Sequence, residues 1–432
     1  MFQTLTGVWK AKDLRKRLLF TLMILAVYRI GVVIPVPGVN ASALQAIANK
    51  SAVVGLLNTF SGGALNQFSI FSMSIYPYVT ASIIVQLLQM GVVPIWEDWS
   101  KEGETGRAKL TQWTRYLTVF LGLIQSVALT YSFSRELGTG FIADPTIWTF
   151  ALIAITLTSG TTFLMWLGEQ ITDKGVGNGI SVIIFLSILS RLETVIPQIY
   201  TSWFYAHPDQ LFLNIIKVVI LLAIVLALVV FVVFVQQGVR RIPVQYTQKQ
   251  VGNKVYAGQS SFLPFKVNAA GVIPVIFASS LLFFPTIVAQ FFRGHPWSDW
   301  VTNNFSPTSW IYAVVEFVLI VAFTFFYTHV QLNPSQLAEN MQKNAGYILG
   351  IRPGKATEEY LIRIMNRLSL IGGLFLAVVS VIPLVFVGIT GLTTVAFYFG
   401  GTSLLIVVGV AIDTMRQLEG QMLQRSYRGF IR

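Results

Sequence analysis

Long apolar segments recur along the chain, separated by short polar ones, and they predict ten membrane-spanning helices. A hydrocarbon core roughly 30 Å thick is crossed by about 20 helical residues. The fifth segment is the weakest, because Arg191 and Glu193 interrupt it, and we expect it to be short or tilted. The expected spans are Leu18–Ile34, Ser72–Val93, Tyr116–Phe133, Ile147–Leu167, Gly179–Ile196, Leu211–Val235, Val267–Phe284, Trp310–Val330, Leu368–Val387 and Thr393–Ile412.

Composition and charge indicate the class of protein and its orientation. The chain is 54% hydrophobic and only 11% charged, which excludes an ordinary soluble domain. Near the span ends, 24 of the 30 Lys and Arg residues fall on one side, the side of both termini. Because cytoplasmic loops carry the excess of Lys and Arg, we expect both termini in the cytoplasm.

The polar segments complete the predicted organisation. Residues 1–17 read as an amphipathic segment lying on the membrane surface, and residues 416–432 as a cytoplasmic tail. Residues 236–266 and 331–367 are cytoplasmic loops that carry about ten of the basic residues. These basic loops suit anionic lipid headgroups, acidic protein surfaces or RNA phosphates equally well.

Residues 55–68 are too apolar for an ordinary loop, yet too short and Gly-broken to span a membrane. Irregular backbone at membrane depth is tolerated only when it is buried in protein or lines a water-filled cavity. Two interpretations therefore stand side by side. The segment is either an outer loop packed on the bundle or a short re-entrant helix in its centre.

Both long loops contain signals of local structure. Residues 240–246 alternate apolar and polar side chains, Gly252 and Asn253 give a turn, and the extended pattern resumes at Lys254, which predicts a β-hairpin. In the second loop Asn333 and Thr357 are expected to cap two helices. Between these helices, Arg352 is held at a stiff tip flanked by glycines. It is either a topology-setting charge or a docking contact.

The sequence lacks the motifs of metal sites, nucleotide-binding loops and serine hydrolases. The chain has no Cys and three scattered His residues, so no thiolate or His-rich metal site is expected. Neither a GxxxxGK[ST] phosphate loop nor a GxSxG elbow occurs, and the glycines of residues 175–179 read as a flexible entry into the fifth span. Arg29, Glu316 and Asp413 lie toward span ends, unlike the midplane cage of an ion-coupled transporter.

Seven strings, taken in order along nearly the whole chain, resemble the SecY family of bacterial protein translocation channels. One short string would be weak, whereas seven in order across ten spans are highly specific. They are Phe60-Ser-Gly-Gly-Ala-Leu65, Pro77-Tyr-Val-Thr-Ala-Ser-Ile-Ile84, Lys101-Glu-Gly-Glu-Thr-Gly-Arg107, Gly177-Asn-Gly-Ile-Ser181, Leu263-Pro-Phe-Lys-Val-Asn-Ala-Ala-Gly-Val-Ile-Pro274, Gly350-Ile-Arg-Pro-Gly354 and Tyr398-Phe-Gly-Gly-Thr-Ser-Leu-Leu405.

The resemblance implies the architecture. It implies an all-α integral membrane protein whose ten spans form two pseudo-symmetric five-helix halves around a central pore, with a short plug helix and a cytoplasmic β-hairpin. The halves are residues 18–200 and 201–415, and residues 55–68 become the plug. We saw no internal repeat in the sequence itself.

The resemblance also implies the site residues. Without the resemblance, the apolar residues of the ring would be interpreted as ordinary lipid-facing or packing residues. Val79 is one methylene smaller than the Ile that is commoner at this position in the family. The implied sets are the pore ring, Val79, Ile83, Ile180, Ile184, Ile276 and Ile406; the plug, Phe60, Ser61, Gly62, Gly63, Ala64 and Leu65; the lateral gate, Phe284, with Ile84, Gln86, Ser279 and Ser280 as weaker candidates; and partner docking, Arg352, with Arg240, Arg241 and Lys254.

The implied function is that of a protein-conducting channel in the bacterial plasma membrane, not an enzyme. It would pass unfolded secretory polypeptides and release signal peptides and membrane helices sideways into lipid. The ATPase SecA or a ribosome would drive it, and SecE and SecG would be its small membrane subunits. No cofactor, metal or direct nucleotide binding is expected. A small-solute secondary transporter and a non-conducting membrane scaffold are the rival hypotheses.

Overall fold

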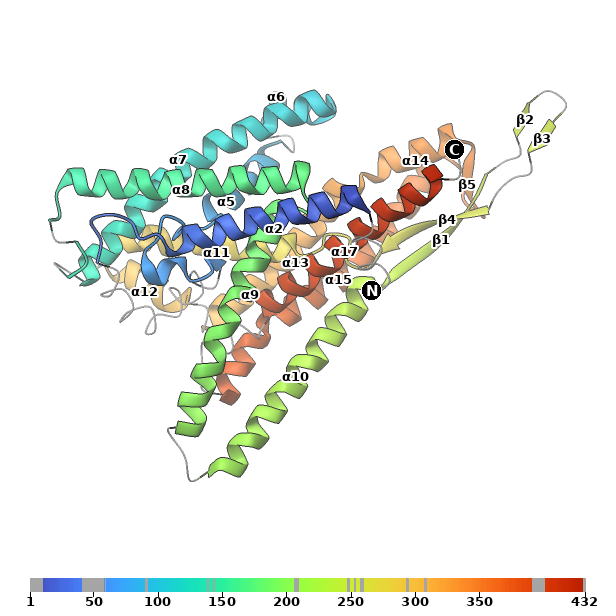
Figure 1. The fold of residues 1–432 in the computed structure, drawn as a ribbon. Helices are drawn as coiled ribbons and strands as arrows, with labels where there is room; N and C mark the ends of the chain where they lie inside the picture. The colour runs from blue at the N-terminus through green and yellow to red at the C-terminus, as the bar shows by residue number, and fades with distance from the viewer. Residues whose placement is uncertain are drawn as a thin grey trace.

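The chain, described here by a computed structural model, is built mostly of helices with a small sheet at one end (Figure 1). The structure describes residues 11–40, 58, 60–89, 92–137, 140–142, 144–205, 210–246, 249–251, 254–256, 260–292, 295–306, 309–390 and 401–429. Its helices are α2 (Lys12–Val33), the 3-10 helix η1 (Ala64–Gln67), α5 (Tyr76–Leu88), α6 (Pro94–Lys101), α7 (Glu104–Leu137), α8 (Ile147–Lys174), α9 (Gly179–Ile199), the π-helix η3 (Tyr200–Tyr205), α10 (Leu211–Gln237), α11 (Ile273–Phe291), α12 (Pro296–Asn304), α13 (Trp310–Leu332), α14 (Pro334–Lys343), α15 (Lys355–Thr390) and α17 (Gly401–Gly429).

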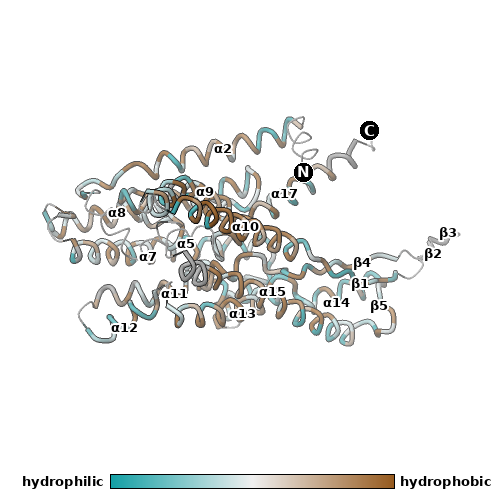
Figure 2. Tube along the Cα trace, turned by 90° about the horizontal axis from the view of Figure 1, so that it is seen from below, coloured by the Kyte–Doolittle hydropathy of each residue, from teal (hydrophilic) through white to brown (hydrophobic). Residues whose placement is uncertain are grey.

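Each of the ten predicted spans falls on one of these helices. Among the described residues, seven helical segments are long and apolar enough to cross a membrane, and they contain α7, α8, α9, α10, α13, α15 and α17. Helices α5 and α11 are shorter apolar helices, and α2 carries Lys16, Arg17 and Arg29 along its length. Hydrophobic colour dominates these helices in Figure 2. The prediction of a multi-pass helical membrane protein is confirmed.

Several helices depart from their predicted limits: α11 begins at Ile273 rather than Val267, and three further differences bear on the site. Helix α5 begins only at Tyr76, because most of residues 69–75 form turns that lead out of the candidate plug. Helix α9 is not short: it continues past Arg191 and Glu193 into η3, and Figure 1 shows it steeply inclined to α8. Helix α2 begins at Lys12, so the described basic residues of the expected surface segment belong to the span helix itself.

The polar end of the molecule carries five strands. The first long loop does form the predicted hairpin, with Val251 opposite Lys254, while residues 252 and 253 of its turn lie outside the described part. Strand β5 of the second long loop joins the sheet of the first, which the sequence did not predict. The strands are β1 (Val239–Tyr246), β2 (Lys249–Val251), β3 (Lys254–Tyr256), β4 (Ser260–Lys266) and β5 (Gly346–Ile348), and β1 pairs antiparallel with both β4 and β5.

Alternation along β1 explains how the sheet attaches to the bundle. Ile242 and Val244 are buried in a small core with side chains of α14 and α15, whereas Arg241 and Pro243 face solvent. This period of two is the pattern of a strand with one covered face. Helix α2 begins and α17 ends at the same end of the bundle as this sheet, and α12 lies at the other end (Figure 1).

Of the two helix caps predicted in the second long loop, one is confirmed. Asn333 caps α14, and its side chain accepts a hydrogen bond from the amide of Gln336. The prediction for Thr357 is wrong, because α15 begins at Lys355 and already includes it. The Thr357 hydroxyl instead donates to the carbonyl of Arg352 at 2.8 Å, which fastens the tip that precedes the helix.

A close contact between α8 and the chain behind the candidate plug yields a stability test. A Cβ at Gly160 would collide with the main-chain carbonyl of Ile70, which cannot move like a flexible side chain. We expect Gly160→Ala to destabilise the protein by about 1–3 kcal/mol, measured by thermal unfolding in detergent. Gly420→Ala is the matched control, since nothing lies within 4 Å of its Cβ position. Equal melting temperatures for the two variants would contradict this packing.

Candidate functional site

The six ring candidates come from four helices and meet in one apolar cluster. Helix α5 supplies Val79 and Ile83, α9 supplies Ile180 and Ile184, α11 supplies Ile276 and α17 supplies Ile406. Val79, Ile83, Ile184 and Ile406 are buried, and the other two are partly buried against the same cluster. Residues more than 300 positions apart in the sequence are therefore brought to one place.

A small cavity lies against this cluster. Its volume is about 20 Å³, and a water needs roughly 10–15 Å³ on this measure. The cavity therefore has room for about one water and none for a peptide. The described side chains around this cavity are therefore closely packed, which the sequence could not tell. Its lining contains the ring, plug and gate candidates Phe60, Val79, Ile184, Ile276, Ser279 and Ser280, together with Ser74, Ile75 and Tyr76.

The candidate plug divides into two parts with different neighbours. Phe60 and Ala64 belong to the same cluster as the ring, and Phe60 meets the ring of Tyr76 edge to face at 5.7 Å between centroids. Leu65 and Phe68 are instead buried in a second cluster with side chains of α7 and α8. Only the first part, up to Ala64, faces the centre of the bundle, while residues 55–57 and 59 lie outside the described part.

The helices of the candidate lateral gate are in contact. Helix α11 packs against α5 and α7 on one side and against α13 on the other. Phe283 is buried and meets Tyr76 at 5.4 Å between ring centroids, whereas the predicted Phe284 is 48% exposed. The buried ring at this seam is therefore Phe283, and Phe284, the gate residue that the resemblance implies, lies next to it in the chain with its side chain half exposed.

The weaker gate candidates also differ in burial. Ser279 and Ser280 are buried and line the small cavity, and the Ser280 hydroxyl finds no hydrogen-bond partner among the described residues. Ile84 and Gln86 are half-buried, and the Gln86 amide donates to the Ser82 hydroxyl on its own helix. Ser279 and Ser280 therefore lie beside the small cavity, whereas Ile84 and Gln86 are not among its lining residues.

The docking candidates gather on the sheet. Arg240 and Arg241 are exposed on β1, and Arg352 is exposed four residues beyond the end of β5, which pairs with β1. The pairing of β1 with β5 ties the two loops together, and these three exposed residues are called the basic surface below. Gly350 and Gly354 flank its tip with φ of 80° and 101°, values that favour glycine. Lys254 lies in β3, and its side chain is outside the described part.

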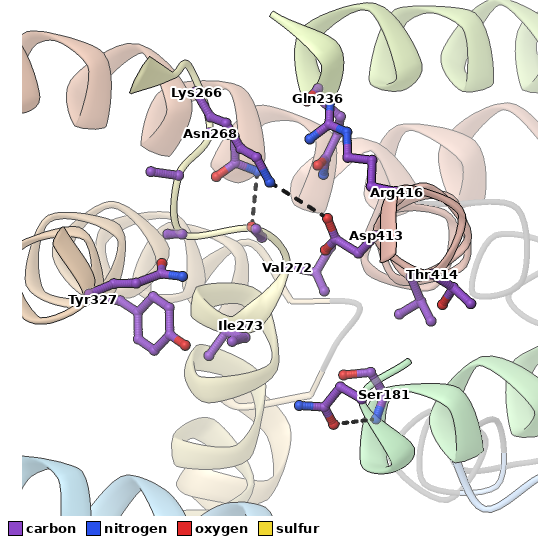
Figure 3. A pocket seen from close by; sticks show the side chains of 16 residues that line it. Ser181, Gln236, Lys266, Asn268, Val272, Ile273, Tyr327, Asp413, Thr414 and Arg416 are labelled. Carbon is purple, nitrogen blue, oxygen red and sulfur yellow. Dashed lines mark hydrogen bonds and ion pairs between the residues drawn. The ribbon is translucent and has the colours of Figure 1, made fainter. Parts of the chain in front are cut away.

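A larger polar cavity opens where β4 ends and α11 begins (Figure 3). Its volume is about 260 Å³, and α9, α10, α11, α13 and α17 contribute to its lining. Lys266 pairs with Asp413 at 4.0 Å, and Arg416 donates to the carbonyl of Gln236 at 3.2 Å. The sequence pointed to Asp413 only as a charge at a span end and did not bring these groups together.

Other chemistry finds little support in the described residues. No group of three or more His, Cys, Asp or Glu side chains that could hold a metal ion occurs in the part of the chain that the structure describes. Glu316 is buried in the second turn of α13, deeper than a span-end charge, but no ion pair among the described residues includes it. A single carboxylate is not the cage of an ion-coupled transporter.

Comparisons with known proteins agree with this geometry. The family model for SecY matches residues 69–415. The protein translocase subunit SecY of Bacillus licheniformis is 51% identical over 432 residues, covering all of both chains. A solved SecY structure, in which the plug domain is said to stabilise the closed state of the translocation channel and maintain a membrane seal, has a TM-score of 0.65 at 19% identity over 94% of this chain and 91% of that one.

Similarity extends to a eukaryotic channel. Sec61 in the canine ribosome-channel complex has a TM-score of 0.59 at 18% identity, over 94% of this chain and 91% of that chain. At such identities the likeness speaks for the fold alone, whereas the family match and the full-length relative also define the family. The chain belongs to the SecY family.

Proposed function

We propose that this chain is the protein-conducting channel of a bacterial Sec translocon. The observation that carries the proposal is the convergence of Val79, Ile83, Ile180, Ile184, Ile276 and Ile406 on one closed apolar cluster, with Phe60 against it and a polar cavity on the inner side. An uncharged collar gives a passing chain no group to bind. The channel can therefore accept polypeptides of any sequence.

The chemistry of the collar suits a gate that moves. Val and Ile are β-branched and stiff at χ1, so they keep their shape as a chain slides past. When no chain is present, a narrow apolar constriction resists water and ions by dewetting. The segment from Phe60 to Ala64 would add a second barrier on the outer side of the ring.

Sideways release would take place where α11 meets α5 and α7. Separation of this seam would expose the pathway to lipid, and a signal peptide or membrane helix would then partition according to its hydrophobicity. Phe283 and Tyr76 hold the seam closed through their ring contact. Phe284, half exposed beside them, would meet the lipid or the emerging segment.

The partners supply energy and complete the complex. The basic surface of Arg240, Arg241 and Arg352 suits a motor such as SecA or the phosphates of a ribosome, and Sec61 is described in a ribosome-channel complex. SecE and SecG are the expected membrane subunits. The channel itself is not an enzyme, and both of its termini would face the cytoplasm of the bacterial plasma membrane.

Reconstitution tests the whole proposal. The chain, copurified with SecE and SecG and inserted into lipid vesicles, should protect a secretory precursor from added protease when SecA and ATP are present. Vesicles without the chain are the control. Absence of ATP-dependent protection would count against the proposed function, whereas ion-coupled uptake of a small solute would revive the transporter hypothesis.

Deletion of residues 60–64 tests the plug. We expect the resting ion leak of vesicles to rise about tenfold or more, because only the apolar ring would then close the pathway. Phe68→Ala is the matched control: it removes edge-to-face contacts with Phe133 and Phe141 at 6.2 and 5.1 Å, away from the ring. That variant should lose about 3–5 kcal/mol of stability without leaking. An unchanged leak in the deletion variant would contradict the plug assignment.

A further inference from the structure

Two side chains of α2 hold the candidate plug by its main chain. Tyr28 and Ser61 are both fully buried, and the Tyr28 hydroxyl lies 3.1 Å from the carbonyl oxygen of Ser61. The same hydroxyl lies 2.6 Å from the hydroxyl of Ser187 on α9. Tyr28 and Ser187 carry one hydroxyl proton each, and the Ser187 hydroxyl also lies 2.8 Å from the carbonyl oxygen of Ile183. When Tyr28 donates to Ser61, its oxygen is free to accept from Ser187, which then donates to Tyr28 in place of Ile183. One phenol thus connects α2, α9 and the plug.

Arg29 makes the next contact along the same segment. Its Nη1 donates to the carbonyl oxygen of Gly62 at 3.1 Å, and its Nη2 pairs with the Glu193 carboxylate at 3.3 Å. A hydrogen bond from a charged donor is stronger than one between neutral groups. Two consecutive plug carbonyls, those of Ser61 and Gly62, are therefore held by two consecutive residues of α2.

The glycines of the plug are what allow this approach. Gly62 and Gly63 have φ of 65° and 93°, in the left-handed region that side chains disfavour. A Cβ at Gly62 would lie 2.9 Å from the Tyr28 hydroxyl and 3.2 Å from the Ser187 Cα. At Gly63 it would lie 3.0 Å from Nη1 of Arg191. The conformation and the clearance both require glycine at the point of contact.

We propose that Tyr28, Arg29 and Ser187 form a latch that holds the plug over the closed ring by its main-chain carbonyls. The inference rests on the proposed function and adds positioning residues to it. Opening the channel must break these hydrogen bonds. The latch therefore adds to the free energy that a signal peptide has to supply when it opens the pathway.

Tyr28→Phe is the first test, because it removes only the hydroxyl and keeps the ring that stacks on Phe71 at 5.9 Å. Loss of one buried hydrogen bond should shift the resting equilibrium about two- to tenfold toward the unlatched state. We expect the ion leak of vesicles to rise by this factor, and export of a precursor with a weakened signal peptide to rise with it. Tyr200→Phe, the same change on a ring that is 62% exposed, is the matched control.

Arg29→Gln and Ser187→Ala test the other two members. Arg29→Gln should raise the leak at least as much as Tyr28→Phe, since the lost donor is charged. Glu193→Gln removes the exposed ion pair but leaves the contact with Gly62, so we expect a change within about twofold. An Arg29 effect that Glu193→Gln reproduces in full would assign it to the ion pair and overturn this part of the latch.

A plug-deleted background separates the latch from a general structural role. In the channel lacking residues 60–64, Tyr28→Phe and Ser187→Ala should add nothing to the leak, because the carbonyls they hold are gone. An equal rise in both backgrounds, or no rise in the intact channel, overturns the latch. If the deletion itself does not leak, the plug assignment fails and the latch with it; if the deletion leaks while the substitutions do not, only the latch fails.

Discussion

Arg352→Glu is expected to reduce ATP-driven translocation about tenfold or more without disturbing the fold. Arg352 is exposed at a tip that its own carbonyl contact with Thr357 holds in place, so the side chain itself has no packing role there. Arg residues at interface centres commonly contribute about 2 kcal/mol or more to binding. Reversal of the charge also introduces repulsion wherever the partner surface is acidic or phosphorylated.

The measurement is protease protection of a secretory precursor in vesicles, with SecA and ATP added. Lys174→Glu provides the matched control, because it reverses an exposed charge at the end of α8, which belongs to neither the sheet nor the Arg352 tip, on the side predicted to be cytoplasmic. The Lys174→Glu channel should translocate the precursor at nearly the rate of the unmodified channel. Normal translocation by the Arg352→Glu channel would remove the docking role from this tip.

The spans were predictable because their signal is local and strong. Some twenty apolar residues in sequence require a membrane or a large core, and neighbouring basic residues indicate the side. The limits of α5 were less predictable. Residues 69–75 contain neither Gly nor Pro to mark their turns, and the sequence signal for the start of α5 is Pro77 in its first turn, where proline suits a helix.

The ring candidates were suggested only by family resemblance. Ile184 is buried on α9, and Leu189, five residues later on the same helix, is 41% exposed, yet both read as ordinary apolar residues of a span. Burial inside a pore and exposure to lipid select the same side chains, so hydropathy cannot separate them. The location of Phe283, rather than Phe284, at the seam is likewise a matter of helix rotation that composition does not encode.

Contacts between segments that are distant in the chain could not be predicted from the sequence. Tyr28 and Ser187 are 159 residues apart, and the pairing of β1 with β5 joins two loops separated by α11 and α13. Each depends on how whole helices pack. The glycines at 62 and 63 did mark an unusual backbone, but only the fold reveals which donors approach it.

Exchange of the ring side chains for Thr is expected to cause the largest leak. Val79, Ile184 and Ile276 line the small cavity, and Thr keeps the branch at Cβ while a hydroxyl replaces one methyl group of Val or the ethyl group of Ile. Hydroxyls offer water hydrogen bonds in the constriction, so dewetting should fail. In the channel lacking residues 60–64, the triple Thr variant should leak about tenfold more than the deletion alone. An unchanged conductance would show that this cluster is not the barrier.

Val79→Ile should lower the resting ion leak, whereas the Thr substitutions should raise it. It therefore tests whether the packing of the ring seals the channel. The cavity beside Val79 has room for about one water and therefore for one added methylene, and burying that group contributes about 0.8 kcal/mol. If the methylene fills the cavity without strain, the closed state gains that free energy and the resting leak falls up to about fourfold. A higher leak would mean that the ring is already packed to its limit and that extra volume forces α5 and α11 apart.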